Sequence, residues 1–175
     1  MAFSVYCIAN SDSQAVRIAN RLRTSGFSAS DISVLAPDRS GLRDLGHHNS
    51  TKAPEGAAAG AGTGALLGGA LGWLAGIVAL AIPGVGPLIA AGPILAMLSG
   101  AALGGAMGGL TGALVGAGIP EFEAQQYEGR LREGNILMSV HAEDSDEAAR
   151  IRQIFSEEKA EHITTGSEAS VPSAR

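Results

Sequence analysis

Charge is missing from the middle of this chain. Between Glu55 and Glu121, 65 consecutive positions hold no Asp, Glu, Lys, Arg or His. Roughly a quarter of the residues of a soluble domain are normally charged. An uncharged stretch of this length therefore excludes an ordinary solvated surface, and it separates two charged flanks. The same stretch holds 19 of the 25 glycines, so the chain has two parts by composition.

Other absences narrow the function classes further. Cys7 is the one cysteine, so no intrachain disulfide can form, which agrees with a reducing compartment. No basic region precedes a long apolar run at the N-terminus, so we expect no cleaved secretory signal and a cytoplasmic first flank. The net charge is −5 and no Lys/Arg cluster occurs, which argues against nucleic acid as a partner.

No pattern in the sequence indicates a catalytic, cofactor or metal site. His47 and His48 lack further ligands at metal-binding spacing. Gly60–Gly64 lacks the Lys-Ser/Thr pair of a phosphate loop. The acidic run Glu143–Glu147 opens a predicted helix, where negative charge favours the helix dipole. Cys7 lies in a predicted strand without a nearby histidine, which favours a buried, inert thiol. We therefore expect a protein that is not an enzyme.

The first flank predicts a strand, a helix and a second strand. Phe3–Ala9 is short and rich in β-branched and aromatic residues. Ser11–Gln14 has the spacing of a capping box ahead of apolar residues at helical intervals. Gly26 is placed to end that helix, and Asp31–Ala36 reads as the second strand. This flank is a βαβ unit.

The second flank repeats this order. Ile136–Ala142 predicts a strand, Asp144–Glu147 a capping box, and Ala148–Phe155 a helical apolar stripe. The last strand is expected near Glu161–Thr165. A shift of 133 residues superposes four identical pairs in one frame: Ala9 on Ala142, Ala15 on Ala148, Arg17 on Arg150 and Ile18 on Ile151.

Two βαβ halves of this kind commonly pair as one ferredoxin-like sheet. The predicted fold class is therefore α+β, a split βαβ domain interrupted by a glycine-rich insert. A short amphipathic helix is expected over Glu121–Glu133, leading into the third strand of the domain. The expected divisions are residues 1–37 for the first half, 38–55 for a linker, 56–120 for the insert, 121–165 for the connector helix and second half, and 166–175 for a disordered tail.

Glycine recurs at every fourth position through much of the insert. Residues four apart share one face of a helix, so each run presents a groove without side chains that a second backbone can approach closely. The spacers are Ala, Leu, Ile, Val, Met and Trp73, which is unlike a hydrated linker. The predicted helix-packing residues are Gly56, Gly60, Gly64, Gly68, Gly72, Gly76, Gly100, Gly104, Gly108, Gly112 and Gly116.

The two glycine runs together predict a helical hairpin. Leu66–Ile82 and Leu88–Leu103 are lipophilic, and each arm exceeds the roughly 20 residues that cross a hydrocarbon core. Because the insert leaves and re-enters one domain, it must cross an even number of times. We expect a hairpin inserted in the inner membrane, with both flanks cytoplasmic. The predicted hairpin turn consists of Pro83, Gly84, Gly86 and Pro87.

Burial of the hairpin inside a homo-oligomer is the alternative to a bilayer. Gly56–Ala65 is too weakly apolar to face lipid alone, since glycine and alanine contribute little transfer energy. We therefore expect the glycine faces to pack on another helix, within a subunit or between subunits. The expected partners are the lipid bilayer and further copies of this chain.

The first 40 residues resemble a known family. Val5–Ala9, Gly26-Phe27 and Asp31–Asp38 are similar to the N-terminal region of bacterial YflT-like general stress proteins, in which a strand, a helix, a glycine turn and a strand of the type D-I-S-V-L follow in that order. The rest of the chain resembles bacterial stress-related membrane proteins only in architecture. The resemblance implies a bacterial, non-enzymatic, stress-associated protein, and it transfers no catalytic residues.

Two function classes follow. In the first, the protein is a membrane-associated structural or protective factor that self-assembles through its glycine-zipper helices. In the second, the α+β domain is a sensor or adaptor for a ligand or protein, and the hairpin is an anchor.

Overall fold

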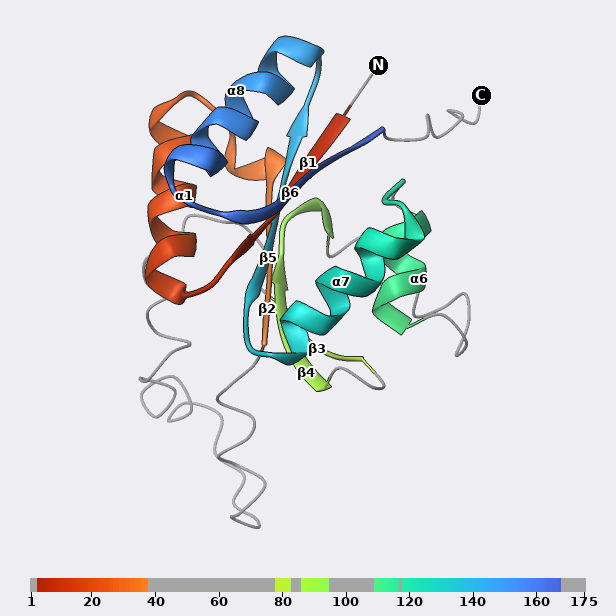
Figure 1. Ribbon diagram of the computed structural model, residues 1–175. Helices are drawn as coiled ribbons and strands as arrows, with labels where there is room; N and C mark the ends of the chain where they lie inside the picture. Colours follow the sequence, from red (N-terminus) through yellow and green to blue (C-terminus); the bar gives the residue numbers. More distant parts are fainter. Residues whose placement is uncertain (1–2, 38–77, 83–85, 95–108, 117, 168–175) are drawn as a thin grey trace, which may run out of the picture.

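The computed structural model describes residues 3–37, 78–82, 86–94, 109–116 and 118–167. These residues form an α+β fold in which four helices pack on an antiparallel sheet (Figure 1). The elements are β1 (Phe3–Ala9), α1 (Asp12–Thr24), the 3-10 turn η1 (Ala29–Asp31), β2 (Ile32–Pro37), β3 (Val78–Ile82), β4 (Gly86–Ala91), α6 (Gly109–Gly116), α7 (Glu121–Arg132), β5 (Ile136–Ala142), α8 (Ser145–Glu157) and β6 (Glu161–Ser167).

The two βαβ halves interleave in the sheet. The strand order is β3-β4-β2-β5-β1-β6, and every neighbouring pair is antiparallel. Strand β1 of the first half therefore lies between β5 and β6 of the second half. Strand β5 in turn lies between β1 and β2, with Val140 opposite both Val5 and Ile32. The sequence prediction that the flanks build one α+β domain is confirmed.

The 133-residue repeat is visible in the element bounds. Shifting β1 by 133 gives the bounds of β5, and shifting α1 by the same amount gives the bounds of α8. The caps follow the same shift, since Ser11 caps α1 and Asp144 caps α8. Past the other ends of these helices, Gly26 and Lys159 both adopt positive φ, of 95° and 58°. The two halves thus share their turns as well as their elements.

The helix caps offer a matched pair of substitutions. Asp144 accepts hydrogen bonds from the backbone N–H groups of Asp146 and Glu147 at 2.9 and 2.8 Å, whereas Ser11 accepts one from Gln14 at 3.3 Å. We expect Asp144→Ala to lower the free energy of unfolding by about 1–2 kcal/mol and Ser11→Ala by about 0.5–1 kcal/mol. Urea titration followed by circular dichroism measures both. Equal midpoints for both variants and the wild type would contradict the cap assignment.

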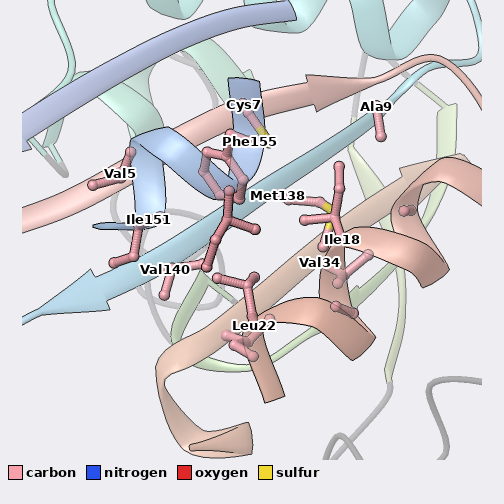
Figure 2. Packing of buried hydrophobic residues seen from close by; sticks show 14 of the residues in the cluster. Val5, Cys7, Ala9, Ile18, Leu22, Val34, Met138, Val140, Ile151 and Phe155 are labelled. Carbon is pink, nitrogen blue, oxygen red and sulfur yellow. The ribbon is translucent and has the colours of Figure 1, made fainter. Parts of the chain in front are cut away.

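One face of the sheet packs against α1 and α8, and we call it the first face. Figure 2 shows side chains of β1, β5 and the two helices meeting there, with Ile18 and Leu22 from α1 and Ile151 and Phe155 from α8. These four side chains are buried. Burial of large aliphatic and aromatic side chains is the main source of stability in such a core.

The opposite face, which we call the second face, carries α6 and α7 (Figure 1). Its buried cluster joins side chains of the sheet to both helices. The members are Tyr6, Ile8, Leu35, Leu88, Ala90, Ile94, Leu110, Ala113, Leu114, Ile119, Ala124, Tyr127, Leu131 and Leu137. The connector helix is present as predicted, because α7 covers Glu121–Arg132. It turns Ala124, Tyr127 and Leu131 toward the sheet.

The predicted helical hairpin is wrong for residues 78–82 and 86–91. These residues form β3 and β4, and Ile82 pairs with Gly86 across the predicted turn site. Strand β4 also extends the sheet from β2, with Leu88 opposite Pro37. This pairing supplies hydrogen-bond partners to an edge of β2 that would otherwise lack them. Tertiary pairing therefore decides the structure of these apolar residues, whose composition alone does not separate a strand from a helix.

Candidate helix-packing surface

Helix α6 is the part of the predicted zipper that the structure describes. Leu110, Ala113 and Leu114 are buried against the second face. Gly112 and Gly116 lie on the exposed side of the helix. These two glycines are helical, as predicted, and they share one face at a spacing of four. Of the other predicted zipper and turn residues, Gly86 begins β4, Pro87 follows it in the same strand opposite Ala81, and the rest lie outside the described residues.

The exposed side of α6 has no charged side chain. The helix sequence is GLTGALVG, whereas α1, α7 and α8 carry charged residues. Its one polar side chain, Thr111, is turned to α7, where its backbone N–H and its hydroxyl both donate to the Glu128 carboxylate. A helix that is apolar on all sides is normally buried on all sides. The described residues cover only one side of α6.

No described residue fills the space beside the exposed glycines. A Cβ atom placed on Gly112 or Gly116 would meet no described atom within 4 Å. Gly92 is the opposite case, because a Cβ there would lie 2.2 Å from the Ile32 carbonyl oxygen. The domain therefore requires glycine where the chain turns after β4, but it has no steric need of glycine on the outer side of α6.

Two large apolar side chains are exposed, one on α6 and one on α7. Val115 of α6 is 41% exposed, and Phe122, in the first turn of α7, is 71% exposed. The contiguous helix face formed by Gly112, Val115 and Gly116 is named the outer α6 face below. Sequence reasoning identified the two glycines but missed Val115, because it does not stand out from the apolar residues around it.

A polar cluster joins α7 to β6 on the same face of the sheet. The Tyr127 hydroxyl donates to the His162 carbonyl oxygen at 2.6 Å. His162 has a φ of 49° at an irregularity in the β1–β6 register. Its Nε2 atom lies 3.2 Å from the Arg130 guanidinium, which is a donor only, so Nε2 accepts. Burial raises the pKa of Tyr127 well above its ordinary value. These hydrogen bonds connect β6 to α7 and stabilise the edge of the sheet.

Replacing Tyr127 with phenylalanine tests the contribution of its hydrogen bond to stability. At neutral pH we expect Tyr127→Phe to lower the free energy of unfolding by about 1–2 kcal/mol, because the His162 carbonyl loses its donor. Since the folded-state pKa is raised, the stability from neutral Tyr127 is intact below about pH 10 and declines above it. The variant should therefore lose less stability than the wild type between about pH 9 and 11. Urea midpoints measured across this range check both expectations, and parallel pH profiles would contradict the second.

Cys7 is fully buried on the first face, and burial raises the pKa of its thiol. That agrees with the predicted buried thiol. In the described ranges, no group of three or more His, Cys, Asp or Glu side chains could hold a metal ion. None of the described helices is long and apolar enough to cross a bilayer. The acidic run is a helix cap, as its spacing predicted, with Asp144 as the N-cap residue.

No protein-family model, curated protein or solved structure matches this chain.

Proposed function

We propose that this chain is a non-enzymatic, stress-related bacterial protein. In this proposal it associates with the cytoplasmic face of the inner membrane and with copies of itself through its charge-free, glycine-repeat segment. The order β6-β1-β5-β2 of the four flank strands supports a ferredoxin-like topology for the domain that carries this segment. The resemblance of Asp31–Asp38 to YflT-like general stress proteins supports the stress-related part.

The observation that carries the proposal is the direction in which α6 turns its glycines. The leucine side of the helix packs on the sheet, and Gly112 and Gly116 lie on the opposite side, where no described atom would be within 4 Å of an added Cβ. Glycine lowers helix propensity by up to about 1 kcal/mol per residue relative to alanine. A repeated glycine face that the domain core does not use is therefore best explained by close packing against a further helix.

Membrane association is proposed without a hairpin that spans the bilayer. Strands β3 and β4 belong to the sheet, so the longer charge-free stretches outside the described part are 56–77 and 95–108. Fourteen residues, 95–108, would measure about 21 Å as a helix, against about 30 Å for a hydrocarbon core. The stretch 56–77 could cross once, but its chain must return to the same sheet. Contact with the membrane surface requires neither a longer helix over residues 95–108 nor a second crossing by residues 56–77.

Sizing and flotation test the proposed function. We expect the full-length wild type to form oligomers in analytical ultracentrifugation and to float with phospholipid vesicles. Replacing Gly104 and Gly108 together with leucine should shift the oligomer toward monomer. The matched control is Gly129→Leu on α7, where a Cβ would also meet nothing within 4 Å. An unchanged oligomer in the double variant, or a wild type that neither floats nor associates, would refute the proposal.

A further inference from the structure

The outer α6 face is both apolar and uncovered by the described residues. It combines the 41% exposed Val115 with two glycines beside which no described atom lies within 4 Å. Exposed charged side chains occur on each of the other described helices, for example Arg17 on α1, Arg132 on α7 and Arg152 on α8. The outer α6 face therefore differs from the other helix surfaces in having no charged side chain, as well as in having glycines. This difference indicates that a further apolar element packs on the outer α6 face.

The position of α6 on the sheet limits where that element comes from. Helix α7 contacts β5 and β2, and α6 shares the buried cluster with Leu88 and Ala90 of β4. Thr111 of α6 faces α7. With 3.6 residues per turn, Gly112 and Gly116 lie roughly opposite the buried Leu110 and Leu114, so the outer α6 face is turned away from the sheet. The strand next to β4, on the side away from β2, is β3.

One segment of the chain is connected at both ends to strands next to β4. Residues 38–77 leave β2 after Pro37 and return at Val78, the first residue of β3. Pro37 lies opposite Leu88 and Val78 lies opposite Ala90, so both ends attach beside β4, whose Leu88 and Ala90 share the buried cluster with α6. Within this segment, Gly56–Gly76 carries glycine at every fourth position, and Gly76 precedes Val78 by two residues.

We infer that the segment Gly56–Gly76 of the same chain docks on the outer α6 face, with its glycine side against Gly112 and Gly116. As a helix this segment would be about 31 Å long, and the linker 38–55 reaches up to about 60 Å when extended. Tethering next to β3 gives it a high effective concentration at α6 compared with a second copy. The inference rests on the proposed function in one respect: both assume that a glycine face packs against another helix. In this arrangement the glycines Gly100, Gly104 and Gly108 remain available for self-association.

Disulfide crosslinking of the full chain tests the inference. In a Cys7→Ala background, Gly116→Cys is combined in turn with Gly68→Cys and with Gly72→Cys, and the protein is oxidised at low concentration. We expect at least one pair to give an intrachain crosslink, seen as a faster monomer band on a non-reducing gel. The control pairs Gly72→Cys with Gly129→Cys on α7 and should give several-fold less crosslink.

A second measurement covers the case in which the paired cysteines disturb folding. With Gly72→Cys as the only thiol, its rate of modification by a maleimide should rise several-fold when Gly116→Leu is added, because the docked segment is displaced. Gly129→Leu should leave the rate unchanged. A crosslink between two chains would assign the face to a second copy, and it would overturn the inference while the self-association of the proposed function stood. No crosslink together with an unchanged maleimide rate would also overturn it, and sizing of the same samples would show whether self-association fails too.

Discussion

Gly92→Ala is expected to lower the free energy of unfolding by about 2–5 kcal/mol. Gly92 has a φ of 82°, and a Cβ there would lie 2.2 Å from the Ile32 carbonyl oxygen and 2.8 Å from the Ser33 Cα atom. Backbone strain and overpacking each cost about 1–3 kcal/mol. Relief by movement would also disturb the buried hydrogen bond from the Ile94 N–H to the Ser33 hydroxyl, which spans 3.0 Å. Urea titration followed by circular dichroism measures the loss.

Gly129→Ala is the matched control for this prediction. Gly129 lies inside α7, is exposed, and has no described atom within 4 Å of an added Cβ. Alanine there should raise the free energy of unfolding by about 0.5–1 kcal/mol, since glycine is a weak helix former. If Gly92→Ala unfolded at the wild-type midpoint, the close approach of Gly92 to the start of β2 would be wrong, and with it the pairing of β4 with β2.

Leu114→Ala is expected to lower the free energy of unfolding by about 2–5 kcal/mol. Leu114 is fully buried between α6 and the sheet, so truncation removes buried apolar surface and leaves a cavity. The same substitution should speed amide exchange in α6, because this helix is held mainly by Leu110, Ala113 and Leu114. Denaturant titration and exchange mass spectrometry measure the two effects.

Phe122→Ala supplies the comparison for Leu114. The phenylalanine is the larger side chain, but it is 71% exposed, so its removal should change the free energy of unfolding by no more than about 0.5 kcal/mol. Equal losses from the two substitutions would mean that α6 does not pack on the second face. A large loss from Phe122→Ala alone would place a covering element over α7.

The flank elements could be predicted because their signals are local and agree with one another. The capping residues Ser11 and Asp144, the left-handed turn at Gly26 and the alternating strands all point to the observed bounds. The pairing of two βαβ halves follows from topology rules that leave few arrangements for the strands. The turn at Lys159 could not be predicted in the same way, because Lys159 adopts positive φ although it is not a glycine.

The strands within the charge-free segment could not be predicted from apolar composition alone. Short apolar runs do not distinguish a buried helix from a buried strand. One signal was nevertheless present, since β3 and β4 fall between Gly76 and Gly100, where the four-residue glycine repeat is interrupted. For α6 the repeat predicted the helix and its glycine face. It did not reveal which side meets the sheet, because α6 has no charged side chain and Thr111 is its one polar side chain.

The central claim is that residues 86–94 and 109–116 belong to the α+β domain and do not form parts of independent membrane helices. Native-state hydrogen exchange of the full chain, read by mass spectrometry in rising urea with and without phospholipid vesicles, tests it most directly. The account predicts that peptides from these residues open together with those from β1 and β5, and that vesicles leave their protection unchanged. Protection that appears only with vesicles, or exchange in these peptides while β1 and β5 stay closed, would contradict it.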